Sequence, residues 1–186
     1  MDLIDSQENP TIAPLAGTHE VYIRLTANAN TENECKKLIE PTKEKILARI
    51  GDYYYGSDDI VIEQALMNII NKSFSIYDGV TNGALYTRLK NQDLNHLLKG
   101  QLPDSSVFVS DFDDILDKLK YVSQYVKDLY KTDWGIALLH NQEQVYLGYY
   151  DDSVFKYETF KMPLKRNILK SRSQNYAMIN LINWFK

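Results

Sequence analysis

The stretch Trp134–Tyr150, WGIALLHNQEQVYLGYY, decides the fold of the larger part of this chain. Two apolar runs are separated by the polar residues His140–Glu143, which is the pattern of a β-hairpin. Val154–Phe160 follows as a third candidate antiparallel strand. Just before the hairpin, Asp111–Lys131 carries apolar residues at helical spacing, so we expect an amphipathic helix that packs on this sheet.

The first part of the chain predicts a smaller unit with its own strand and helix. Val21–Thr26 alternates apolar and polar residues, as a half-buried strand does. Thr31 and Glu34 have the spacing of a capping box and predict the start of a helix. We expect Pro41 to break or kink that helix, since proline removes a backbone donor. Tyr53–Tyr55 then reads as a short aromatic strand.

The middle and the end of the chain add further alternating elements. Phe74–Tyr77 and Val107–Val109 read as short strands, Thr81 to about Lys99 as a helix, and the chain from Pro163 onward as a final helix. The element order predicts an α/β (α+β) protein. It has a small α/β domain followed by a larger α/β domain with a mixed sheet.

Composition excludes several classes of protein. The net charge of −4 lacks the overall basic character of a nucleic-acid binder. A single cysteine, Cys35, excludes an intrachain disulfide and a cysteine-based zinc site, and the three scattered histidines suggest no metal centre. No glycine-rich phosphate loop occurs, so we expect no cofactor. No apolar run is long enough for a bilayer and Met1–Asp5 is unlike a secretory signal, so we expect a cytoplasmic chain.

Three stretches resemble CinA-type competence/damage-inducible proteins. They are NPTIAP at residues 9–14, VYIRLTA at residues 21–27 and GDYYYGSDD at residues 51–59. That family reads roughly "NPTIAP…V.LRLTA…LGDYIYG.DD", so both wording and spacing are similar.

The resemblance implies a domain layout. Residues 1–18 would be a connector, the end of an N-terminal molybdopterin-binding-like domain that is missing here. Residues 19–57 would form a KH-like domain, and residues 58–186 a CinA C-terminal domain of the nicotinamide mononucleotide deamidase type.

The resemblance also allows a test of the active site. The family motif "ESCTGG" falls on DGVTNG here, which retains an acid as Asp78 and keeps Thr81 and Gly83. The serine is replaced by Gly79, which has no side chain to attack a carbonyl. The later family segments "YSN..K" and "VTGIAGPGG" have no counterpart in this chain. Three altered parts predict a degenerate, non-catalytic domain that serves as a scaffold or binding module.

The alternative is an active nicotinamide mononucleotide amidohydrolase that uses substitute residues. Ser105, Ser106, Thr81 and Lys99 are the candidates for such substitutes.

Each candidate residue also has a structural interpretation. Thr81 is either a helix N-cap or a ligand contact, and Asp78 either a turn residue or a retained polar contact. Lys165 and Arg166 are a candidate phosphate-binding pair or part of a solvated helix face.

Partners follow from the resemblance and from what the sequence lacks. The family implies a homodimer, and a nucleotide is the candidate ligand. KH domains that bind nucleic acid carry a GXXG loop, and residues 19–57 contain none, so we expect no nucleic-acid partner. Because no apolar run is long enough for a bilayer, we expect no membrane partner either.

Overall fold

A computed structural model describes residues 3–17, 20–103, 112–142, 144–162 and 166–186. The chain divides into two compact units, Met1–Tyr54 and Tyr55–Lys186. Each unit is described by itself below.

The first unit contains a β-hairpin and one long helix. Strands β1 (Thr11–Ala16) and β2 (Val21–Thr26) pair antiparallel, followed by helix α1 (Glu32–Ile50) and the short 3-10 helix η1 (Gly51–Tyr53). Strand β1 corrects the expectation of a connector over residues 1–18. The expected domain start at residue 19 would separate two strands that pair along their whole length. The sequence alone does not predict β1, because Pro14 cannot donate a hydrogen bond and argues against a strand, although β1 runs through it.

Helix α1 starts where the capping box predicts. The Thr31 hydroxyl accepts the Glu34 N–H at 3.2 Å, and the Glu34 carboxylate accepts the Thr31 N–H at 3.1 Å. The predicted break at Pro41 is wrong, because α1 runs through this residue. The expected strand at Tyr53–Tyr55 is also wrong. The chain turns through η1 instead, with the Tyr54 N–H on the Gly51 carbonyl at 3.0 Å.

The second unit is built on a five-stranded mixed sheet of order β4-β3-β5-β6-β7. Strand β3 is parallel to both β4 and β5, whereas β5, β6 and β7 are successive antiparallel neighbours. The predicted hairpin is confirmed. The elements are α2 (Ile62–Ile69), β3 (Phe74–Asp78), α3 (Ala84–Lys90), β4 (Leu98–Pro103), α4 (Ile115–Tyr130), β5 (Trp134–Asn141), β6 (Gln144–Tyr150), β7 (Phe155–Lys161) and α5 (Arg166–Phe185).

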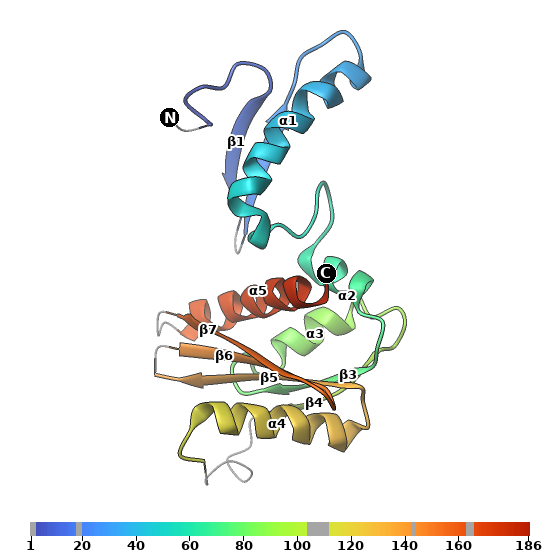
Figure 1. The fold of residues 1–186 in the computed structure, drawn as a ribbon, viewed down its shortest axis with the longest axis vertical. Helices are drawn as coiled ribbons and strands as arrows, with labels where there is room; N and C mark the ends of the chain where they lie inside the picture. The colour runs from blue at the N-terminus through green and yellow to red at the C-terminus, as the bar shows by residue number, and fades with distance from the viewer. Residues whose placement is uncertain (1–2, 18–19, 104–111, 143, 163–165) are drawn as a thin grey trace. The chain divides into compact units, whose positions relative to one another are not determined.

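Helices cover both faces of this sheet (Figure 1). Helices α2, α3 and α5 share one core with the strand residues Phe74, Ile76, Ile136 and Leu138. Helix α4 packs on the opposite face against Tyr77, among others. An α/β fold with a mixed sheet is therefore confirmed. The central strands β3 and β5 are buried on both faces.

Two local predictions in this unit differ from the structure. The helix expected from Thr81 to Lys99 is only α3, and Lys99 lies in strand β4. The strand expected at 107–109 lies outside the described residues. In the parts of the chain that the structure describes, no helix combines the length and the apolar character that a bilayer crossing requires.

Candidate functional site

The candidate site lies where β3 ends and the chain turns toward α3. From β3 the chain passes to β4 on one side, and then returns across β3 to β5 on the other. In open α/β sheets, ligands bind outside the carboxyl ends of strands where the order reverses in this way. Asp78, the last residue of β3, lies level with Leu138 of β5 and Pro103 of β4.

Asp78 holds the turn together from inside. Its side chain is buried, and one carboxylate oxygen accepts the N–H groups of Val80 at 3.2 Å and Thr81 at 2.7 Å. The other oxygen accepts the Gly83 N–H at 2.8 Å and the Thr81 hydroxyl proton. The donors that this turn could offer to an anion therefore point at a carboxylate of the chain itself.

The Thr81 hydroxyl is used twice. It donates to Asp78 and accepts the N–H of Leu85 at 3.0 Å, in the first turn of α3. Gly83, with φ of +87°, is the residue that precedes α3 and brings no side-chain cap of its own. Thr81 supplies the capping oxygen from two residues earlier, so its hydroxyl stabilises the start of α3.

Gly79 lies against the neighbouring strand. Its N–H donates to the Leu138 carbonyl at 2.8 Å, which extends the contact between β3 and β5 by one residue. A Cβ at this position would lie 2.9 Å from the same oxygen and 3.3 Å from Cδ2 of Leu139. Both neighbours are buried in the sheet. The position therefore has no room for a side chain without a shift of β5.

The other candidate residues are not brought to this turn by the described structure. Lys99 sits on an irregularity at the beginning of β4, level with Phe74 and Ser75, which is the opposite end of the sheet from Asp78. Ser105, Ser106 and Lys165 lie outside the described residues, and Arg166 is placed only as the first residue of α5.

His140 is a feature that the sequence did not predict. The sequence pattern places it in the polar turn between two strands, but it is a half-buried residue of β5 and pairs with Val145. Its Nε2 atom is buried and has no hydrogen-bond partner among the described residues. The only sequence signal for this placement is its position directly after an apolar strand.

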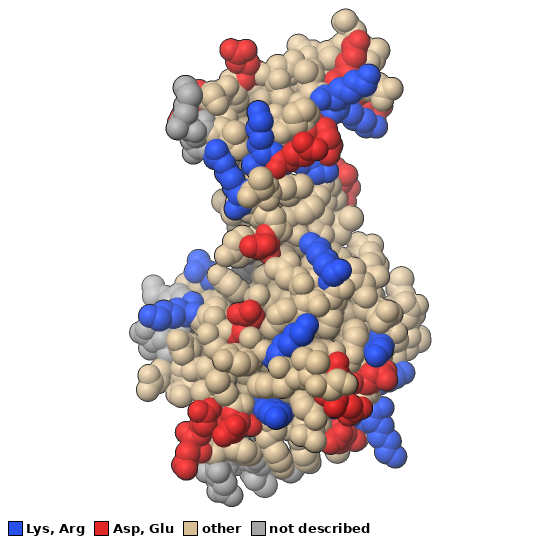
Figure 2. All heavy atoms as spheres, in the orientation of Figure 1, with Lys and Arg blue, Asp and Glu red and all other residues tan. Residues whose placement is uncertain are grey.

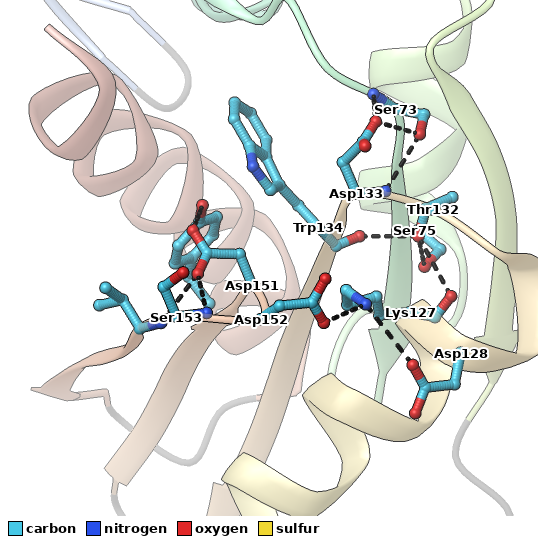
Figure 3. A network of polar contacts seen from close by, with 12 residues as sticks. Ser73, Ser75, Lys127, Asp128, Thr132, Asp133, Trp134, Asp151, Asp152 and Ser153 are labelled. Atoms are coloured by element: carbon cyan, nitrogen blue, oxygen red, sulfur yellow. Dashed lines mark hydrogen bonds and ion pairs between the residues drawn. The ribbon is translucent and has the colours of Figure 1, made fainter.

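A second polar cluster lies at the other end of the sheet (Figure 3). The Asp133 carboxylate accepts the N–H of Ser73 at 2.9 Å and its hydroxyl at 2.6 Å. The Ser73 hydroxyl, followed by its N–H, lowers the pKa of Asp133. Nearby, the hydroxyl groups of Thr132 and Ser75 share a hydrogen bond at 2.9 Å. The Thr132 hydroxyl also donates to the Trp134 carbonyl at 2.9 Å. These contacts lock the beginning of β3 to the beginning of β5.

At the same end of the sheet, Lys127 of α4 forms an ion pair with the turn between β6 and β7. Lys127 is almost fully buried, and its ammonium lies 2.7 Å from Asp152 and 3.6 Å from Asp128 (Figure 3). The hydrogen bond to Asp152 contributes most to the raised pKa of Lys127. The pair fixes the end of α4 to the turn between β6 and β7, which makes it a structural contact.

The comparisons with known proteins agree with the sequence resemblance. The family model "Damage-inducible protein CinA KH domain" matches residues 1–56. A CinA-like protein from Dictyoglomus thermophilum is 29% identical over 100% of this chain and 51% of its own length. The chain is therefore similar to CinA-type proteins along its whole length. The family match begins before β1, in agreement with the hairpin that replaces the expected connector.

Further CinA relatives show how much of the family this chain represents. A CinA-like protein from Dictyoglomus turgidum is 36% identical over 54% of the chain and 26% of the relative. The chain thus spans about half, or less, of the length of these curated CinA relatives.

Solved CinA structures share the fold of most of this chain. A CinA superfamily protein from Enterobacter cloacae has a TM-score of 0.57 at 10% identity, over 72% of this chain and 98% of that one. The competence/damage inducible protein CihA from Agrobacterium tumefaciens has a TM-score of 0.53 at 10% identity, over 70% and 100%. At such low identity these structures establish the CinA fold alone.

Proposed function

We propose that the second unit is a degenerate deamidase-type domain of a CinA-family protein, which does not hydrolyse amides and serves as a scaffold or binding module. The observation that carries this proposal is the turn after β3, where the Asp78 carboxylate accepts the N–H groups of Val80, Thr81 and Gly83 and the hydroxyl proton of Thr81. Amide hydrolysis needs a nucleophile, a base and donors for the oxyanion.

The nucleophile position supports the proposal most directly. Gly79 has no side chain, and its N–H is engaged by Leu138, so it offers neither a nucleophile nor a free donor. The close approach of the Leu138 oxygen leaves no space for the serine that the family motif has there. The Leu138 carbonyl and the Leu139 side chain occupy the space that a side chain at Gly79 would need.

The oxyanion requirement gives independent support. A developing negative charge on a substrate is stabilised by donors that are aimed at it in advance. Here the N–H groups of Val80, Thr81 and Gly83 are aimed at the buried carboxylate of Asp78. A substrate oxygen would have to displace that carboxylate, and its approach would be opposed by like charge.

A second candidate function, an active amidohydrolase, rests on the contact between Thr81 and Asp78. A hydroxyl that donates to a carboxylate resembles a nucleophile next to its base. However, Thr81 is 2% exposed and its oxygen already accepts the Leu85 N–H, so a substrate carbonyl has no open path to it. We therefore favour the non-catalytic function.

The test is ammonia release from nicotinamide mononucleotide by the purified chain, beside a CinA relative that retains the serine of "ESCTGG". We expect no release above the buffer background from this chain while the relative turns over. Release that survives purification, is abolished by Thr81→Ala and is retained by Thr81→Ser would establish the active alternative. Calorimetric titration of the same nucleotide then tests the binding role separately, and a nucleotide held near Lys165 and Arg166 remains a prediction.

A further inference from the structure

The hairpin of the first unit leaves one strand edge open. Among the described residues β2 pairs only with β1, and the two strands form a sheet by themselves. The side chains of β2 are largely exposed, with Val21 at 67%, Tyr22 at 49% and Ile23 at 37%. A two-stranded sheet is marginally stable in water, so an open edge with apolar side chains favours a further strand.

The two edges of the hairpin are not equivalent. Pro14 has no N–H and stands opposite Ile23. In the same register the Gly17 N–H donates to the Glu20 carbonyl at 2.9 Å. Hydrogen-bonded pairs alternate from there, so Pro14–Ile23 is a pair without hydrogen bonds between the strands. The amide of Ile12, two residues earlier and pointing the same way, is taken by the side chain of Gln7. The outer edge of β1 is therefore blocked at both positions, as protected edges are.

The same register leaves the outer edge of β2 competent for pairing. Because Pro14–Ile23 is not hydrogen-bonded, the N–H and C=O of Ile23 point away from β1. Residues two apart point the same way, so the peptide groups of Val21 and Leu25 face outward as well. No proline interrupts β2, and its one charged residue is Arg24.

One face of the hairpin is also apolar and poorly covered. Val21, Ile23 and Leu25 share it with Ile12 and Pro14 of β1, as the register shows. Of these, Ile12 alone is buried, and α1 buries none of its own residues. Strands added to the outer edge of β2 would extend this apolar face.

We propose that a second copy of this chain pairs through β2, with the two β2 strands antiparallel and Ile23 on the two-fold axis. Ile23 then faces the partner's Ile23, and Val21 faces the partner's Leu25, in hydrogen-bonded pairs that supply about six backbone hydrogen bonds. The result is a four-stranded sheet of order β1-β2-β2-β1 across the two copies.

A second copy fits this edge because the side chains of β2 are self-complementary in that register. Tyr22 comes to lie opposite the partner's Arg24, and Arg24 opposite the partner's Tyr22. In this pair the two chains approach most closely, so each guanidinium can stack on a tyrosine ring. An antiparallel pairing shifted by one residue would bring apolar and polar faces together and lose both contacts. This interface does not depend on whether the second unit is catalytic.

The first test is the mass of the full chain in solution by size-exclusion chromatography with light scattering. We expect twice the monomer mass of 21.6 kDa for the unaltered chain. Ile23→Lys places two lysines face to face on the axis and should raise the dissociation constant of the dimer at least about tenfold. The control is Leu94→Lys, at an 87% exposed position of the second unit, which should leave the mass unchanged.

A second test reads the register directly and does not depend on a destabilised variant. In a chain with Cys35→Ser, Ile23→Cys should form a covalent dimer on mild oxidation, because hydrogen-bonded partners have Cα atoms about 5.5 Å apart. The control Arg24→Cys should cross-link far more slowly, since Arg24 stands opposite Tyr22 rather than its own copy. A monomer at high concentration, a dimer unaffected by Ile23→Lys, or equal cross-linking at both positions would each overturn the proposal.

Discussion

Replacing Gly79 with alanine adds one methyl group where β3 leaves the sheet. The new Cβ would lie 2.9 Å from the Leu138 carbonyl oxygen and 3.3 Å from Cδ2 of Leu139. An ordinary carbon–oxygen contact is about 3.4 Å or more, so the two strands must separate by roughly 0.5 Å. That movement works against the hydrogen bond from the Gly79 N–H to the same oxygen at 2.8 Å.

The expected cost follows from this geometry. Overpacking a buried site costs about 1–3 kcal/mol. Alanine also restricts the unfolded chain more than glycine does, which offsets about 0.4–1 kcal/mol of that cost. The net loss of unfolding free energy for Gly79→Ala should be about 1–2 kcal/mol, and the melting temperature should fall by roughly 2–8 °C for a chain of this length.

The assay is thermal and urea unfolding of the second unit within the full chain, monitored by the fluorescence of Trp134 and Trp184. Gly51→Ala, in the first unit, is a control for an added methyl group at an open glycine, because no heavy atom lies within 4 Å of a Cβ at Gly51 and its φ of −55° suits alanine. It should leave the unfolding of the second unit unchanged. If Gly79→Ala is as stable as the unaltered chain, the close approach of β5 is not what excludes a side chain from this position.

Gly79→Ser extends the same reasoning to function. The serine meets the same oxygen as alanine, and it faces a turn whose donors already point at Asp78. We expect a similar loss of stability and no ammonia release from nicotinamide mononucleotide. A Gly79→Ser chain that hydrolyses the nucleotide would contradict the reasoning, since restoring one hydroxyl would then be sufficient for catalysis.

Three further predictions concern stability. Asp78→Ala leaves buried N–H groups in the turn without an acceptor, so denaturant unfolding should show a loss of at least about 3 kcal/mol, and a loss below 1 kcal/mol would contradict the central role of this carboxylate. Gly135→Ala places a Cβ on the Ser123 carbonyl of α4 and should destabilise more than Gly79→Ala in the same assay; the reverse order would contradict the direct packing of α4 on β5. Because the Ser73 hydroxyl and N–H lower the pKa of Asp133 in the folded chain, its contribution is present above the unfolded-state pKa of about 3.9 and is lost as pH falls through the lower, folded value. Urea titrations from pH 7 to 3 should show the gap between the unaltered chain and Asp133→Asn closing in that range, and a gap that is constant with pH would refute it.

Charge distribution is consistent with the mild net charge in the sequence. On the face of the second unit shown in Figure 2, basic and acidic side chains are interspersed rather than gathered by sign. The displayed face therefore offers no continuous basic surface of the kind that tracks a nucleic-acid backbone.

Several features of this chain follow from sequence alone because they depend on neighbouring residues. The hairpin of β5 and β6 has two apolar runs around a polar turn, and α4 has its apolar residues at helical spacing. The capping box of Thr31 and Glu34 needs only residues three apart. Gly79 at the position of the family serine is likewise visible without coordinates, and it led to the expectation of a degenerate site.

Other features depended on contacts between distant residues. Strand β1 contains Pro14 and reads as a connector, but it becomes a strand because β2 supplies its hydrogen-bond partners. The first two residues of β4, Leu98 and Lys99, read as the end of a helix, but they belong to a strand because β3 pairs with it. Arg88 and Lys90 followed by Asn91 are only a weak local signal for the end of a helix, so the pairing of β4 with β3 decided the boundary.

The features of the candidate site also fall into those set by neighbouring residues and those set by contacts between distant residues. The sequence by itself determined which residue types stand in the turn after β3, including Gly79 where the family motif has a serine, because a motif is a local pattern. Only the tertiary structure decided that Asp78 and Thr81 turn inward and that Leu138 fills the space beside Gly79. Those outcomes depend on where β5 lies against β3. The two strands are far apart in the sequence: Ser73 and Asp133, which join their beginnings, are 60 residues apart.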